Sequence, residues 1–180
     1  MKTAVATKTK WAIDAAHSEV QFKVKHLVIS TVTGTFKKFN GSLEADEESF
    51  DGADVEFTID ASSIDTNQND RDNHLKSDDF FSADKYKEIT FRNGKLHEVK
   101  NGYTLVGDLT IRDVTKTIEL DVEYGGTMVD PWGNTKVGFE VSGKINRKDY
   151  GLNWNALTEA GGVLVGEEVK LNINVQLARV

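Results

Sequence analysis

The chain has 180 residues, of which 38% are hydrophobic, and its 29 acidic and 22 basic residues give a net charge of −7. This length suits one domain with a sizeable core, while the acidic balance argues against nucleic acid as the main partner, because phosphate binding needs a basic face. The absence of cysteine excludes disulfides, thiolate metal sites and a thiol nucleophile.

The N-terminal region shows no targeting or membrane signal. Residues 1–10 lack the apolar core of a secretory signal, and no stretch of the sequence is long and apolar enough to be a transmembrane helix. We therefore expect an N-terminal tail over residues 1–10, a single domain over residues 11–180, and no integral membrane protein. As written, the sequence predicts a cytoplasmic location, and a periplasmic one if an upstream signal was removed.

Short runs in which apolar and polar residues alternate predict β-strands, because a period of two gives each strand one buried face. In chain order, we expect such strands over residues 10–14, 20–26, 27–46, 55–59, 89–92, 95–99, 103–111, 118–124, 137–145 and 169–177. In the third run, Phe36 and Phe39 break the alternation and predict a bulge or bend near Lys37. Asn93-Gly94 and Asn101-Gly102 predict tight hairpin turns.

The segment from Asp70 to Phe81 interrupts this alternation and predicts a helical insert. It contains no Gly or Pro, and Asp70 is a good N-cap because its carboxylate can accept from free backbone N–H groups. Leu75, Phe80 and Phe81 form an apolar edge, so we expect one or two short helical turns with an apolar underside. Two interpretations stay open: a lid over the end of a barrel, or an ordinary connection whose aromatic residues fill the core.

The strand pattern also predicts the architecture. About eight long strands with one apolar face, joined by turns such as the acidic turn at residues 46–52 and without crossover helices, require antiparallel pairing. So many strands need closure to protect the sheet edges. The predicted fold is therefore an all-β, up-and-down antiparallel barrel, whose interior either just fills or holds one small apolar ligand.

Several motifs, in collinear order from Trp11 to the C-terminus, resemble the YceI-like family. They are Trp11…Asp14…His17-Ser18…Phe22…His26, Gly34-Thr35-Phe36…Phe39-Asn40-Gly41, Arg71-Asp72-Asn73-His74-Leu75…Asp79-Phe80-Phe81, Gly107–Lys116, Ile145–Leu152 and Gly166–Val169. Two positions depart from the family pattern, since Asp113 stands where Gly is usual and Tyr150 where Phe is usual. The resemblance implies an extended, lipocalin-like, eight-stranded β-barrel with a long apolar pore. It also implies binding of polyisoprenoids, isoprenoid quinones or similar long-chain lipids, and frequent homodimers.

The inward faces of the predicted strands and the apolar edge of the insert supply the candidate ligand-binding residues. They are Phe22, Val24, His26, Phe36, Phe57, Ile59, His74, Leu75, Phe80, Phe81, Phe91, Leu109, Ile111 and Phe139. His26 is either a polar group inside a pocket or a satisfied core residue. Arg71, Asn146 and Arg147 are candidates for binding a head group, because Arg offers a fork to phosphate. Alternatively, Arg71 and Asp72 pair on the surface or cap the helix.

Catalytic and metal sites receive little support from the sequence. Asp14, His17 and Ser18 are the residue types of a hydrolytic triad, but triads are defined by spatial roles. The four histidines show no paired metal-ligand spacing. We expect a non-enzymatic barrel, without metal or cofactor, that binds a long-chain lipid for storage, transport or sequestration. The alternatives are an enzyme acting on a small apolar substrate in the same pocket and a stress-response barrel without a ligand.

Overall fold

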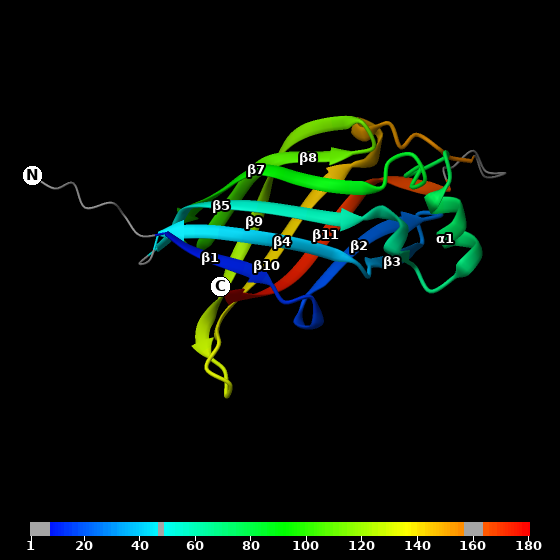
Figure 1. Ribbon diagram of the computed structural model, residues 1–180. Coiled ribbons are helices and arrows are strands. Elements are labelled where there is room, and N and C mark those ends of the chain that lie inside the picture. The colour runs from blue at the N-terminus through cyan, green and yellow to red at the C-terminus, as the bar shows by residue number, and fades with distance from the viewer. Residues whose placement is uncertain (1–7, 47–48, 157–163) are drawn as a thin grey trace, which may run out of the picture.

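The computed structural model describes residues 8–46, 49–156 and 164–180. In chain order, its elements are β1 (Lys8–Ile13), η1 (Ala15–His17), β2 (Glu19–His26), β3 (Ser30–Phe36), β4 (Phe39–Asp46), β5 (Ser49–Asp60), η2 (Ala61–Ser63), β6 (Ile64–Asp65), α1 (Asn69–Lys76), β7 (Glu88–Val99), β8 (Gly102–Ile111), β9 (Val114–Val129), β10 (Thr135–Asn146), η3 (Arg147–Tyr150) and β11 (Val165–Arg179). Long strands run along an elongated body, and α1 lies at one end of it (Figure 1). We call this end the α1 end.

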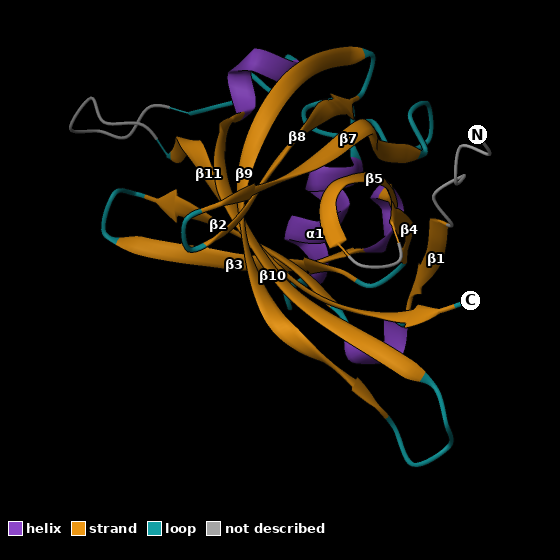
Figure 2. Cartoon of the chain, turned by 90° about the vertical axis from the view of Figure 1, so that its left-hand side faces the viewer, coloured by secondary structure: helices purple, strands orange, loops and turns teal. Residues whose placement is uncertain are grey.

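The strands close into an antiparallel barrel, because β1 and β2 follow one another along the same edge of β11. Ile13 lies opposite Leu177, and Glu19 lies opposite Asn174. In the same way, β3 pairs with β2, and β4 pairs with β1. On their other edges, β3 pairs with β6 and β4 pairs with β5. If β1 and β2, β3 and β4, and β5 and β6 are each counted as one broken strand, the barrel wall has eight strands in sequence order. Figure 2 shows this ring of strands from one end. The predicted eight-stranded, all-β barrel is confirmed.

The breaks in neighbouring strands lie beside one another. The backbone N–H of Lys37 donates to the carbonyl of Ser63 at 3.1 Å, and that of Asp60 donates to the carbonyl of Lys38 at 2.9 Å. The break between β3 and β4 is therefore joined to the break between β5 and β6 by hydrogen bonds. The bend predicted near Lys37 is confirmed, and it divides the predicted run 27–46 into two strands.

Asn93-Gly94 is not the hairpin turn that we predicted. β7 continues through both residues, and its two halves pair with the same neighbours, β5 and β8. Asn93 has a φ of 55° and the pairing shifts register here, so the pair forms a β-bulge. A Cβ on Gly94 would lie 2.6 Å from both the Phe91 ring and the Val55 carbonyl oxygen. The glycine is thus required by close packing within the wall. The turn predicted at Asn101-Gly102 does join β7 to β8.

Several other boundaries differ from the sequence prediction. β3 begins at Ser30, because residues 27–29 of the predicted run 27–46 form the turn after β2. β5 begins at Ser49, inside the predicted acidic turn, and β1 begins at Lys8, before the predicted first strand. The N-cap of α1 is Gln68 and not Asp70, because the Gln68 side chain accepts a hydrogen bond from the backbone N–H of Arg71. Asp70 lies in the first turn instead, where its negative charge suits the helix dipole.

The end of the barrel opposite α1 is filled by aromatic side chains. Phe50 packs against Trp11 and Tyr124 with ring centroids 5.8 and 5.9 Å apart, and Tyr103 lies 6.4 Å from Phe139. We call Trp11, Phe50, Tyr103 and Tyr124 the aromatic plug. Phe139 contacts the plug, since its ring lies 5.3 Å from that of Phe50.

Candidate functional site

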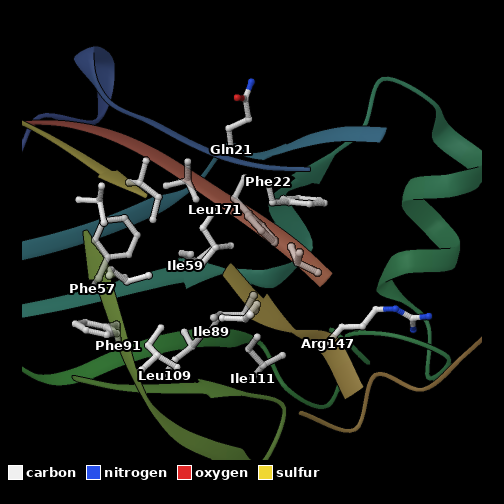
Figure 3. A pocket seen from close by; sticks show the side chains of 18 of the residues that line it. Gln21, Phe22, Phe57, Ile59, Ile89, Phe91, Leu109, Ile111, Arg147 and Leu171 are labelled. Atoms are coloured by element: carbon white, nitrogen blue, oxygen red, sulfur yellow. The ribbon is translucent and has the colours of Figure 1, made fainter. Parts of the chain in front are cut away.

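Between the aromatic plug and α1, the barrel encloses a cavity of about 360 Å³. This volume lies in the range of pockets that bind small molecules. Side chains of Phe57, Phe91, Leu109 and Ile111 point into the same space from different strands, whereas Gln21 points away from it (Figure 3). The alternation along each strand thus places apolar side chains inside and polar side chains outside.

Every apolar and histidine candidate named from the sequence lines this cavity. The set is Phe22, Val24, His26, Phe36, Phe57, Ile59, His74, Leu75, Phe80, Phe81, Phe91, Leu109, Ile111 and Phe139. Further lining residues that the sequence prediction did not name include Val20, Leu43, Ile89, Leu105, Leu120, Val141, Leu171 and Trp154. Most of these occupy inward positions of predicted strands, so the same alternation would have found them. Trp154 lies outside any strand and had no such signal.

One glycine makes room for an aromatic residue of the lining. A Cβ on Gly34 would lie 2.3 Å from the tip of the Phe22 ring, so the ring rests directly on the backbone of the neighbouring strand. Phe22 also lies 5.5 Å from Phe36, whose ring meets Phe81 edge-on at 6.0 Å. The Gly-Thr-Phe motif at residues 34–36 therefore shapes the cavity wall near α1.

The helical insert covers the α1 end of the cavity. Phe80 is buried, and Leu75, Phe80 and Phe81 all face the cavity. His74 packs edge-on against Phe80 and Trp154, with ring centroids 5.1 and 4.6 Å apart. Its Nε2 atom lies 2.9 Å from Asp79 Oδ2. This placement over one end of a cavity favours the lid interpretation of the insert.

Arg71 and Asp72 both bind Thr66 and do not form the surface ion pair considered as an alternative. Arg71 Nε donates to Thr66 Oγ1 at 2.7 Å, and its Nη2 donates to the Thr66 carbonyl at 2.6 Å. The buried Asp72 carboxylate accepts from the Thr66 backbone N–H at 2.8 Å and from its hydroxyl. Arg71 lines the cavity, and its Nη1 makes no hydrogen bond within the described chain. It therefore has donors left for a ligand.

Of the other two head-group candidates, Arg147 lines the cavity but has its guanidinium bound to backbone carbonyls, and Asn146 lies outside the cavity. Arg147 is 3% exposed, and burial holds its pKa below the usual value. Its guanidinium donates to the carbonyl of Gly166 at 2.8 Å and to those of Leu152 and Trp154 at 2.6 and 2.8 Å. It thus ties the segment after β10 to the start of β11. Asn146 caps η3 by accepting from the N–H of Lys148, and it does not line the cavity.

His26 lines the cavity, and its ring has no hydrogen-bond partner among the residues that the structure describes. Of the two interpretations offered from the sequence, this arrangement fits a polar group inside a pocket. A satisfied core histidine would donate or accept through at least one ring nitrogen.

Asp14, His17 and Ser18 do not form a catalytic triad. The Ser18 hydroxyl donates to the backbone carbonyl of Asp14 at 2.7 Å and not to His17. The Asp14 carboxylate lies 2.9 Å from Lys136 Nζ and 2.8 Å from His17 Nδ1, and these hydrogen bonds lower its pKa to about 2. None of the three lines the cavity.

Across the described ranges, no group of three or more His, Cys, Asp or Glu side chains is arranged to hold a metal ion. In the same part of the chain, no helix has the length and apolar character needed to cross a bilayer.

Sequence and structure comparisons find relatives along nearly the whole chain. The YceI-like domain matches residues 11–177. The UPF0312 protein SERP2314 of Staphylococcus epidermidis is 42% identical over 171 residues, which cover 94% of this chain and 98% of that protein. The crystal structure of the Campylobacter jejuni YCEI protein has a TM-score of 0.70 at 34% identity, covering 99% of this chain and 98% of that one.

A polyisoprenoid binding domain from Saccharophagus degradans shares the fold. Its TM-score is 0.66 at 16% identity, and the match covers 94% of this chain and 98% of that domain.

Proposed function

The chain belongs to the YceI-like family, and on that premise we propose that it binds a long-chain apolar lipid inside the barrel. The expected ligands are a polyisoprenoid, an isoprenoid quinone or a similar amphiphile, held for storage, transport or sequestration. The observation that carries this proposal is the cavity of about 360 Å³, whose wall is apolar from Phe139 at the plug to Phe80 beneath α1. Each methylene buried there contributes roughly 0.8 kcal/mol before the costs of binding.

The polar side chains of the cavity suggest the orientation of the ligand. Arg71, His74 and Thr66 all line the α1 end, whereas the far end is bounded by Phe139 and the aromatic plug. We therefore place the head group beside Arg71 and the hydrocarbon chain along the barrel toward Phe139. The free Nη1 of Arg71 would donate to a phosphate or a quinone oxygen.

We further propose that the protein binds its ligand without chemical conversion. Arg71 and His74 are held by Thr66 and Asp79, and the Asp14, His17 and Ser18 set lies outside the cavity. The histidines that line the cavity, His26 and His74, are the candidate bases of an enzyme, and the proposal gives both a role in binding only. The proposal also includes a homodimer, as the family resemblance implies, which light scattering in solution would test.

The test combines extraction of bound lipid with a block of the cavity. Mass spectrometry of an organic extract of the purified protein should identify a long-chain lipid, and titration with an isoprenoid quinone should saturate. Leu109→Trp fills the cavity from β8 and should abolish the titration, although overpacking costs about 1–3 kcal/mol of folding stability. Val106→Trp is the control, because Val106 belongs to the same strand but does not line the cavity.

Thermal melts show whether each variant is folded. A folded Leu109→Trp variant with unchanged affinity would remove Leu109 from the binding site. Absence of both extracted lipid and saturable binding in the wild type would overturn the proposed function.

A further inference from the structure

The turn between β2 and β3 exposes three consecutive apolar side chains. Leu27 is 39% exposed, Val28 72% and Ile29 86%, and we call these residues the apolar tip. β2 and β3 extend toward the α1 end of the barrel (Figure 1). Contiguous apolar residues at the surface are typical of an interaction site rather than of a solvated turn.

The backbone of the apolar tip is unfavourable for its residues. Leu27 has a φ of 53° and Val28 a φ of 65°, so both occupy the left-handed region. Asn and Gly adopt this conformation readily at hairpin turns, while a β-branched residue there is a genuine outlier. Since Val28 and Ile29 are mostly exposed, packing within the barrel does not account for their apolar side chains.

The strands behind the apolar tip are basic in an acidic protein. β2 and β3 contain Lys23, Lys25 and Glu19, a charge of +1, whereas the whole chain carries −7. Lys23 and Lys25 are exposed, and neither forms an ion pair within the described ranges. Lys23 also lies opposite Lys170 of β11, which adds a third positive charge to this face. The apolar tip is therefore flanked by unneutralised lysines.

We propose that the apolar tip inserts into the interfacial region of an anionic lipid bilayer. Val28 and Ile29 would enter the acyl boundary, and Lys23 and Lys25 would lie against the lipid phosphates, a combination typical of peripheral membrane binding. The positive charge of Lys23 and Lys25 complements the phosphates of an anionic bilayer surface. His26 lines the cavity and directly precedes Leu27, so docking would bring the α1 end of the cavity to the membrane. A water-insoluble ligand would then pass between bilayer and barrel without crossing water.

Flotation of the full-length protein with lipid vesicles tests this inference. Vesicles of phosphatidylcholine and phosphatidylglycerol in equal parts should carry the wild type, and pure phosphatidylcholine vesicles should carry much less. Val28→Gly with Ile29→Ser should weaken vesicle binding by on the order of tenfold or more, because it removes the inserted apolar surface. The Gly also suits the positive φ at position 28, so the melting temperature should be unchanged or higher. Lys23→Gln with Lys25→Gln should weaken vesicle binding roughly fivefold per lysine. Added salt should also weaken vesicle binding of the wild type, because it screens the lysine charges.

The matched control lies on the β9–β10 hairpin. Met128 and Val129 are 70% and 60% exposed, so Met128→Ser with Val129→Ser removes similar apolar surface at a different place and should leave vesicle binding unchanged. Titration of the cavity in detergent separates this inference from the proposed function, because Val28 and Ile29 do not line the cavity. Intact cavity binding without wild-type flotation would overturn membrane docking and leave the proposed function standing. Equal flotation of wild type and the Val28, Ile29 double variant would also overturn membrane docking.

Discussion

The two ends of the barrel are built differently. At the plug end, Phe50 packs against Trp11, Tyr124 and Phe139 with ring centroids 5.3–5.9 Å apart, and the interior is filled. At the α1 end, the interior is a cavity, and the surrounding turns hold non-glycine residues at positive φ, including Val28 and Ser82. Strained backbone is tolerated where the rest of the fold determines it, and it concentrates at functional sites. From this comparison we predict that the plug end supplies folding stability and that the proposed ligand binds at the other end.

Besides the packing of Phe80 and Phe81, hydrogen bonds from buried charged groups hold the α1 end. Arg147 binds the carbonyls of Leu152, Trp154 and Gly166, and Asp72 binds Thr66. These hydrogen bonds hold the backbone around the cavity in place, and they do so without side chains that fill the cavity. The wall around the cavity can therefore stay ordered although side chains do not fill the interior there.

The largest effect expected from this comparison concerns two tryptophans. Trp11 in the plug is 5% exposed and its indole N–H donates to Thr9 Oγ1 at 3.2 Å, so Trp11→Ala should lower the free energy of unfolding by about 3–5 kcal/mol. Trp154→Ala, at the cavity, should cost less than half as much, because Trp154 is only partly buried. Urea denaturation of both variants measures the difference. Equal losses would show that the two ends contribute equally to stability.

The second effect concerns ligand affinity and Arg71. Arg71→Gln should weaken binding of an isoprenyl diphosphate by roughly tenfold or more, since a hydrogen bond to a charged group contributes about 1.5–3 kcal/mol. Binding of the corresponding isoprenoid hydrocarbon, which lacks a head group, should change little. Isothermal titration of both ligands gives the two affinities, and Asn146→Ala is the control because Asn146 lies outside the cavity. If the affinity for both ligands fell equally, the role of Arg71 would be to hold Thr66 and not to bind the head group.

The sequence predicted most of the inner wall, because the rule that governs it is local. Alternation in a strand assigns each side chain to a face, so Phe22, Phe91, Leu109 and Phe139 could be placed inside without knowing their neighbours. Closure followed from the number of strands. The β-bulge at Asn93-Gly94 could not be distinguished from a hairpin turn, because the difference depends on the contact of Gly94 with Phe91 and Val55.

The roles of the charged candidates were not predictable from the sequence for a similar reason. Arg71 and Arg147 look alike as head-group ligands. Their partners, Thr66 for one and the carbonyls of Leu152, Trp154 and Gly166 for the other, are set by the folded chain. The same applies to Asp72, for which a surface pair with Arg71 or a helix cap stayed open from the sequence and which the fold buries against Thr66.

The smallest expected effect is the contribution of Asp14 to acid stability. Asp14 lies at the break between β1 and β2, and its carboxylate joins this break to β10 through Lys136 at 2.9 Å. The hydrogen bonds from Lys136 and His17 lower its pKa from 3.8 to about 2. Because the pKa is lower in the folded state than in the unfolded state, Asp14 stabilises the fold fully above pH 4. This stabilisation disappears as the pH falls from about 4 to about 2.

Asp14→Asn measures this contribution directly. Above pH 4, the variant should be less stable than the wild type by about 1 kcal/mol, a value reduced from the full linkage term because solvent reaches the group. Thermal melts at a series of pH values should show the gap closing below pH 4 as the wild-type carboxylate protonates. Asp84→Asn, at an exposed position of the α1 end, should show no such gap. If the Asp14 gap persisted at pH 2, the ion pair with Lys136 would not be the source of the stabilisation, and the break between β1 and β2 would depend on packing alone.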